Sequence, residues 1–131
     1  MAVIPAKYND LLTEKVAFAY LATVMKDGTP QVTPIWFEYA DGKFKLNTAR
    51  GRVKARTLRP GALIAMAISE PANPYRYLQV RGRVTEMTEK GAREHIDKLS
   101  QKYLGKPYPN SQPGEVRVMA TVEPFSAQGM G

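Results

Sequence analysis

The sequence predicts a mainly β protein in which six antiparallel strands close into a small barrel with helical inserts. Short segments of alternating or continuously apolar residues, typical of half-buried and buried strands, recur along the 131 residues. The tight-turn dipeptides Asp27-Gly28 and Asp41-Gly42 separate the first three of these segments, as in β-hairpins. We expect closure because six strands of this kind usually form a small barrel.

Length and composition bound the rest of the prediction. The length is that of one domain, which we expect to span residues 1–131. No apolar run approaches the roughly 20 residues of a membrane helix, and the first residues do not resemble a secretory signal. The absence of cysteine fits the cytoplasm, where we expect the protein. A net charge of +7 points to an anionic partner.

The first half of the chain is expected to hold a short helix and three strands. Residues 5–12 suit a helix, because proline is favoured in the first turn. Residues 16–24 are apolar on both faces, which indicates a central strand. Residues 31–39 form the second strand, and Pro34 places it at an edge or a bulge because proline cannot donate to the ladder. Residues 43–48 alternate clearly and form the third.

The second half is expected to hold three more strands and a longer helix. Residues 62–68 read as a strand that is buried on both faces, and residues 76–86 as a long strand with a bulge at Gly82. Residues 115–122 form the sixth strand, and residues 124–131 show no periodicity. The helix starts at Thr88, ends at Gly105 and has apolar positions at helical spacing: Ala92, Ile96, Leu99 and Tyr103.

A basic segment, residues 47–59, is the strongest functional signal. It contains no acid and five cations: Arg50, Arg52, Lys54, Arg56 and Arg59. We expect a strand end, a turn and a short helix capped by Thr48 and ended by Pro60-Gly61. Arginine, lysine and the helix N-terminus all favour phosphate, so the segment predicts a phosphate site. A solvated helix face remains the alternative.

The sequence offers few side chains for catalysis. His95 is the only histidine, and we expect it on the exposed side of its helix. No metal site, catalytic triad or nucleotide-binding glycine motif stands out. An enzyme of this composition needs a cofactor to carry the chemistry. Trp36 and Phe37 should face opposite sides, so that one joins the core and the other can border a flat ring.

Three blocks of the chain resemble the pyridoxamine 5'-phosphate oxidase-like flavin proteins. Residues 22–24 and 27–37 resemble the family's opening hairpin, residues 47–58 its phosphate-binding segment, and residues 77–84 its long strand. The blocks follow the family's order and cover nearly the whole chain. The short length and the ending Gln128-Gly129-Met130-Gly131 are similar to the small branch that binds the deazaflavin coenzyme F420.

The resemblance implies a six-stranded split β-barrel of the FMN-binding type and a homodimer with cofactor sites at the subunit interface. Arg52 and Lys54 would hold the cofactor phosphate, with Thr48 and Arg50 assisting, and Gln79 would reach in from the other subunit. The deazaflavin ring would lie along Val32, Thr33, Pro34, Ile35 and Trp36. Further cofactor-binding residues implied by the motifs are Asn47, Arg56 and Tyr77.

The leading hypothesis is therefore an oxidoreductase that uses reduced coenzyme F420 to deliver hydride to a small conjugated acceptor. An FMN-dependent oxidase or reductase of the same fold is the first alternative, and a non-catalytic carrier of F420 or FMN is the second. A nucleic-acid module is disfavoured, because no exposed aromatic series accompanies the cations. The electron acceptor cannot be named from sequence, because acceptor pockets are built from loops.

Overall fold

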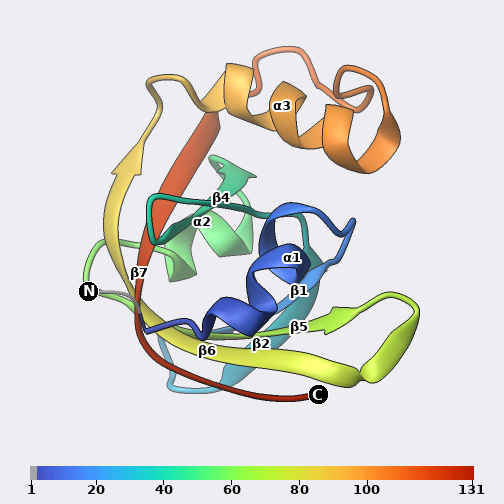
Figure 1. Cartoon of the computed structure of the whole chain (residues 1–131). Helices are drawn as coiled ribbons and strands as arrows, with labels where there is room; N and C mark the ends of the chain where they lie inside the picture. Colours follow the sequence, from blue (N-terminus) through green and yellow to red (C-terminus); the bar gives the residue numbers. More distant parts are fainter. Residues whose placement is uncertain (1–2) are drawn as a thin grey trace.

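The computed structural model describes residues 3–131, which form seven strands, three α-helices and a short 3-10 helix (Figure 1). In chain order the elements are η1 (Ala6–Tyr8), α1 (Asn9–Thr13), β1 (Ala19–Val24), β2 (Pro30–Ile35), β3 (Glu38–Ala40), β4 (Lys43–Ala49), α2 (Val53–Thr57), β5 (Leu63–Glu70), β6 (Asn73–Thr88), α3 (Ala92–Leu104) and β7 (Arg117–Met130).

The seven strands form one antiparallel sheet in the order β2-β1-β5-β6-β7-β4-β3. The expected six-stranded closed barrel is therefore wrong on two counts. The expected second strand breaks at Trp36 and Phe37 into β2, which pairs with β1, and β3, which pairs with β4. These two strands are the edges of the sheet, and within residues 3–131 no pairing joins them. Pro34 lies on an edge strand, as predicted.

Several element boundaries differ from those expected. Strand β7 continues through residues 124–130, which lack apolar periodicity but pair with β6 along their backbone. Backbone pairing leaves no mark in the side-chain pattern. Helix α2 has only five residues, and Thr48 does not cap it because Thr48 lies in β4, paired with Val118. Strand β6 shifts register next to Gly82, which confirms the predicted bulge.

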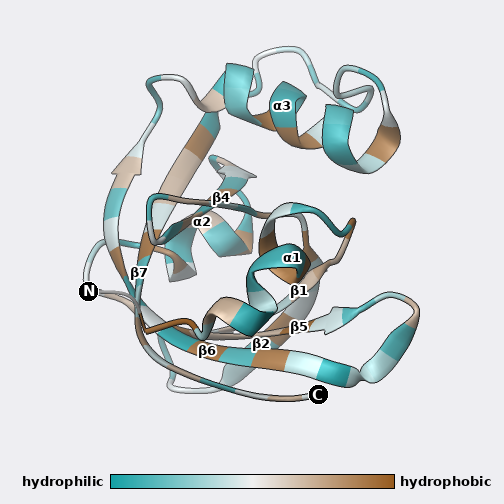
Figure 2. Ribbon diagram, in the orientation of Figure 1, coloured by the Kyte–Doolittle hydropathy of each residue, from teal (hydrophilic) through white to brown (hydrophobic). Residues whose placement is uncertain are grey.

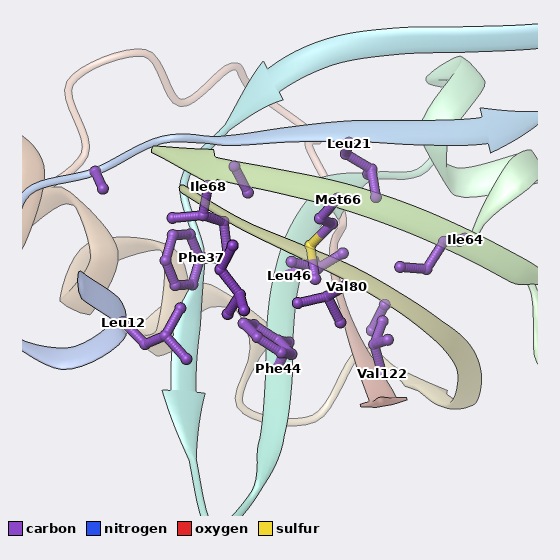
Figure 3. Close-up of a cluster of buried hydrophobic side chains, with 14 of the residues drawn as sticks. Leu12, Leu21, Phe37, Phe44, Leu46, Ile64, Met66, Ile68, Val80 and Val122 are labelled. Carbon is purple, nitrogen blue, oxygen red and sulfur yellow. The ribbon is translucent and has the colours of Figure 1, made fainter. Parts of the chain in front are cut away.

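The hydrophobic core lies against the concave side of the sheet (Figure 3). Phe37 and Phe44 are fully buried and lie 5.8 Å apart between ring centroids. Along β6 buried and exposed residues alternate, which appears as alternating hydropathy in Figure 2. Phe37 thus joins the core while its neighbour Trp36 stays half-buried, as the sequence predicts.

Helix α3 lies across one end of the sheet, where it contacts β7 and β4 (Figure 1). It ends at Leu104 and is followed by Gly105, whose φ of 75° suits glycine at a helix C-terminus. His95 is 6% exposed, so the expectation of an exposed histidine is wrong. Position 95 lies three residues after buried Ala92 and beside buried Ile96, which puts it on the covered face of the helix.

No helix within residues 3–131 is long and apolar enough to cross a membrane.

Candidate functional site

A cavity of about 400 Å³ lies between α3, the ends of β2 and β4, the start of α2 and the loop before β7. It combines an aromatic part with a cationic part. Its lining residues are Phe18, Pro34, Ile35, Trp36, Asn47, Thr48, Arg52, Lys54, Ile96, Leu99, Leu104, Tyr108, Asn110 and Arg117.

The aromatic part is built around Trp36. The indole stacks on Tyr103 with centroids 5.2 Å apart and planes 11° from parallel, and Tyr108 meets it edge-on at 6.2 Å. The Tyr103 hydroxyl donates to the carbonyl of Ala17 at 2.6 Å and accepts from the Phe37 amide. Burial raises the pKa of Tyr103 to about 12. Tyr103 is therefore a neutral, immobilised support for Trp36 and is not a proton donor to a ligand.

The cationic part consists of Arg52, Lys54 and Arg117. Arg52 directly precedes α2 and is exposed, Lys54 is half-buried within α2, and Arg117 begins β7. Burial, and then the charge of Arg52, holds the pKa of Lys54 below its usual range. No carboxylate lines the cavity within the described part of the chain. The site is therefore electropositive.

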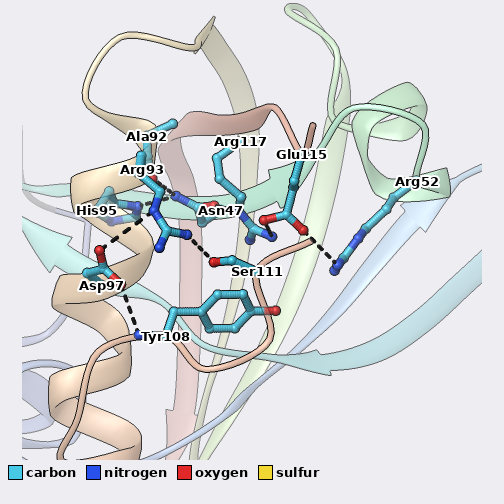
Figure 4. A network of polar contacts seen from close by, with 10 residues as sticks. All are labelled: Asn47, Arg52, Ala92, Arg93, His95, Asp97, Tyr108, Ser111, Glu115 and Arg117. Atoms are coloured by element: carbon cyan, nitrogen blue, oxygen red, sulfur yellow. Dashed lines mark hydrogen bonds and ion pairs between the residues drawn. The ribbon is translucent and has the colours of Figure 1, made fainter. Parts of the chain in front are cut away.

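A polar network positions Arg117 (Figure 4). Its Nε donates to Oδ1 of Asn47 at 2.8 Å, and its guanidinium lies 5.2 Å from the centroid of the Tyr108 ring. Nδ2 of Asn47 donates to the carbonyl of Ala92 at 2.8 Å and lies 3.0 Å from Nδ1 of His95. Asn47 therefore joins α3 to β7, and both hydrogens of its amide are directed at groups of the protein.

The same contacts fix the state of His95. Arginine only donates and a carbonyl only accepts, so the Asn47 amide can point only one way and must donate to Nδ1 of His95. Nδ1 then carries no proton, and the ring is neutral with its proton on Nε2, 3.2 Å from Oε1 of Glu38. Burial holds the pKa of His95 below its usual range, which agrees with a neutral ring.

Glu38 completes this network at the surface. Burial alone would raise the pKa of its carboxyl, but the hydrogen bond and charge of Lys98 outweigh that effect and hold the pKa below its usual range. The carboxylate is therefore ionised beside the Nε2 proton of His95.

Glu115 lies between the two arginines of the cavity. Its Oε2 is 3.6 Å from Nη2 of Arg52, and its Oε1 is 3.5 Å from Nη1 of Arg117. The Glu115 side chain is 8% exposed and that of Arg117 is 4% exposed. One buried carboxylate thus neutralises part of the charge of two guanidinium groups.

The cavity brings together some of the predicted site residues and not others. Those that line it are Pro34, Ile35, Trp36, Asn47, Thr48, Arg52 and Lys54. Those that do not are Val32, Thr33, Arg50, Arg56, Tyr77 and Gln79. Arg50 is exposed and pairs with Glu89 at 3.2 Å, and Arg56 lines a separate hollow with Arg59, Met25, Lys26 and Thr57.

Sequence reasoning missed seven of the residues that line the cavity, among them Phe18, Tyr108 and Arg117. Phe18 precedes β1, and Tyr108 lies in a proline-rich loop whose path the sequence does not indicate. Arg117 could have been noticed, because it lies between apolar residues of a predicted strand. Charged residues in such a position are rarely buried unless they have a partner.

Comparisons with known proteins agree with this architecture. The sequence pattern of the pyridoxamine 5'-phosphate oxidase family matches residues 4–128. A solved structure named F420 reductase is 33% identical, with a TM-score of 0.80, and the match covers 95% of this chain and 98% of that chain. No curated protein matches the chain.

Two more distant structures share the fold. A conserved hypothetical protein from Mycobacterium tuberculosis is 22% identical, with a TM-score of 0.70 and coverage of 99% of this chain and 86% of that one. The FAD and heme binding protein from Mycobacterium smegmatis is 18% identical, with a TM-score of 0.63 and coverage of 99% of this chain and 68% of that one.

Proposed function

The chain belongs to the pyridoxamine 5'-phosphate oxidase family, and from that premise we propose that it is an oxidoreductase that uses coenzyme F420 to reduce a small conjugated acceptor. The observation that carries the proposal is the cavity, which sets an aromatic wall at Trp36 beside the cations Arg52 and Lys54. A ligand in which a flat ring is joined to a phosphate would complement both parts of the cavity. The relative named F420 reductase favours the deazaflavin over FMN.

Each group of residues has a distinct role in this proposal. Arg52 and Lys54 bind the cofactor phosphate, and Thr48, which also lines the cavity, assists them. The segment from Pro34 to Trp36 carries the ring. The deazaflavin supplies the hydride when bound. The side chains of the protein bind and orient the cofactor. The hydroxyl of Tyr103, which stacks on Trp36, is not free to take part in the chemistry because it donates to the Ala17 carbonyl.

We further propose that the protein acts as a homodimer. Pro34, Tyr20, Ala67 and Gln79 are successive partners across β2, β1, β5 and β6, so their side chains share the outer face of the sheet. Three strand spacings separate Pro34 from Gln79, about 14 Å. Gln79 of the same chain is therefore too far to contact a ring held at Pro34, and Gln79 of the partner subunit would supply that contact.

The outer face also has the apolar surface that a dimer would cover. Its exposed apolar residues lie on β1, β2, β5 and β7: Tyr20, Val24, Val32, Leu63 and Phe125. Leu78 and Val80, on either side of Gln79 in β6, are fully buried in the core and do not belong to this face. Light scattering tests the assembly, and a monomer at micromolar concentration would contradict the shared site.

The cofactor is tested by producing the protein in a host that makes both F420 and FMN. We expect the small molecule that copurifies to have the absorption spectrum and mass of F420. Copurified FMN would instead favour the FMN-dependent alternative. Reoxidation of bound, reduced F420 by conjugated acceptors would distinguish an enzyme from a carrier.

The phosphate contact is tested with Lys54→Ala. Removal of one charge-assisted hydrogen bond should weaken F420 binding by roughly 1.5–3 kcal/mol, measured by calorimetric titration. The matched control is Lys43→Ala, which removes an exposed lysine at the opposite end of β4. Equal affinities of the wild type, Lys54→Ala and Arg52→Ala would refute the assignment.

A further inference from the structure

Arg117 is a buried cation that the protein does not fully satisfy. Its Nε is held by Asn47, but its Nη1 has no hydrogen-bond partner among residues 3–131. The residue lines the cavity beside Arg52 and Lys54. A guanidinium fixed at one nitrogen and free at another is preorganised to bind an oxyanion.

Glu115 is a poor partner for this cation. Charge-assisted N–H···O bonds are usually about 2.7–2.9 Å long, whereas its contacts with Arg117 and Arg52 are 3.5 and 3.6 Å. Its Oε1 is buried and, within the described residues, also lacks a hydrogen-bond partner. An ion pair that is buried without hydrogen bonds gains little over its desolvation cost, so it can be exchanged for a better one.

The charges at the cavity are also unbalanced. Three cations line it, and Glu115 is the one carboxylate within 4.0 Å of any of their nitrogens in the part of the chain described. The depressed pKa of Lys54 reflects its burial and the nearby charge of Arg52. A phosphate dianion would compensate most of the charge of the three cations and offers three strong acceptor oxygens.

We propose that Arg117 is a third phosphate-binding residue of this site and that Glu115 is an internal anion that the ligand phosphate displaces from Arg52 and Arg117. The inference rests on the proposed function for the identity of the ligand, but not for the anion site itself. Because Arg52 and Arg117 both contact one carboxylate, one phosphate group can bridge them in its place. The displaced Glu115 belongs to the loop that carries Tyr108, so phosphate binding would also reposition a wall of the cavity.

The test is an NMR titration of the ¹⁵N-labelled protein with inorganic phosphate at constant ionic strength, following the Nε–H signals of the arginines. The two substitutions should act in opposite directions. Arg117→Gln should weaken phosphate binding about tenfold, the effect of one charged hydrogen bond. Glu115→Gln should strengthen it about three- to tenfold, because the neutral amide no longer competes.

Matched control variants remove one negative or one positive charge at exposed positions away from the cavity. Glu94→Gln on the exposed side of α3 and Lys43→Gln at the far end of β4 should leave the phosphate affinity unchanged. Arg117→Lys should recover part of the affinity, because the charge remains while the fork of donors is lost. Thermal unfolding of each variant identifies any that do not fold, and in that case Arg117→Lys and Glu115→Gln carry the test.

The outcomes separate this inference from the proposed function. Unchanged phosphate affinity in Arg117→Gln, with the expected loss in Lys54→Ala, would overturn the inference and leave the F420 proposal standing. Weaker binding in Glu115→Gln would overturn the displacement, since Glu115 would then support the site. Failure of the wild type to bind F420, with opposite effects of the two variants on phosphate, would overturn the proposed function alone.

Discussion

Two buried regions of this molecule differ in what fills them. The core inside the curved sheet consists of apolar side chains such as Phe37, Phe44 and Met66 (Figure 3). The layer between α3 and the sheet instead holds Asn47, His95 and Arg117 in one connected network (Figure 4). Buried side chains make up most of both regions, but only the second contains a charged group, the guanidinium of Arg117.

The difference indicates what each region contributes. Burial of apolar surface is the main source of folding free energy. A buried arginine and its partners must first lose their hydration, so their net contribution to stability is small even when every bond is made. We therefore infer that the core maintains the fold, and that the polar layer maintains the orientation of Arg117 at the cavity. Mutations in the two regions should separate these effects.

The largest expected effect is in the core. Phe44→Ala removes a fully buried ring and should lower the free energy of unfolding by about 3–5 kcal/mol, because it combines lost transfer energy with a cavity. Urea denaturation measures the loss. Affinity for F420 in the folded variant should match the wild type, and a parallel fall in affinity would show that the core and the site are coupled.

A smaller loss of stability, with a change in binding, is expected in the polar layer. Asn47→Leu leaves Nε of Arg117 and Nδ1 of His95 without partners, and should cost about 2–3 kcal/mol of stability. Unlike Phe44→Ala, it should also weaken phosphate binding, because Arg117 loses its orientation. Gln101→Leu, at an exposed amide of α3, is the control. Wild-type phosphate affinity in Asn47→Leu would contradict the positioning role.

The contrast between the two regions also explains how much of the structure could be predicted from the sequence. The core strands follow from apolar patterning, so five of the six expected strands correspond to β1, β4, β5, β6 and β7. The break at Trp36 and Phe37 was not predictable from that pattern, because both halves of the segment remain strand-like. Each half pairs with a different neighbour, and such long-range pairing is not recorded in local periodicity.

The polar layer is less visible in the sequence than the core. The motif positions Thr48, Arg52 and Lys54 do converge on one cavity, because a single β4–α2 connection carries them. Asn47, a predicted cofactor-binding residue that lines the cavity, also makes contacts that the sequence did not indicate, with Ala92, His95 and Arg117. Those partners lie at least 45 positions away in the sequence, and only the packing of α3 on the sheet brings them together.

The pH dependence of stability provides a finer test of the polar layer. Burial lowers the pKa of His95 in the folded protein, so below its ordinary pKa of about 6.5 the unfolded chain binds the extra proton more readily. Stability should therefore be fully present above about pH 6.5 and fall as the pH is lowered towards the folded pKa. One proton limits the slope to about 1.4 kcal/mol per pH unit.

The substitution His95→Gln should remove that slope. Glu38, Lys98 and Lys45 also act on His95, and all three remain in the variant. The carboxyl of Glu38 titrates at lower pH, because its own pKa is held below the usual range. Urea denaturation of both proteins between about pH 7 and about pH 5 measures the difference. If stability depends on pH identically in the two proteins over this range, the pKa of His95 is not lowered by its burial in the polar layer.

The smallest expected effect lies outside both buried regions, at Arg56 and Arg59. Arg52 has an extended backbone and lies outside the five-residue helix α2, so the face that helical spacing would give to Arg52, Arg56 and Arg59 does not form. Arg56 and Arg59 instead line an exposed hollow with Lys26, and Nη1 of Arg59 donates to the Arg56 carbonyl at 3.3 Å. If the carboxylate tail of F420 passes this hollow, each exposed contact should be worth no more than about 1 kcal/mol.

Such contacts should weaken with salt, because the screening length is about 8 Å near physiological ionic strength. Arg56→Ala and Arg59→Ala should therefore reduce affinity for F420 at low salt, and have no effect on the same deazaflavin without its tail. The buried cation Arg117 is screened less, so Arg117→Gln should reduce affinity at low and high salt alike. Titrations of both ligands at two salt concentrations measure the contrast. Equal salt dependence for F420 and FMN, with no effect of tail length in either variant, would remove the exposed cations from the site and favour FMN.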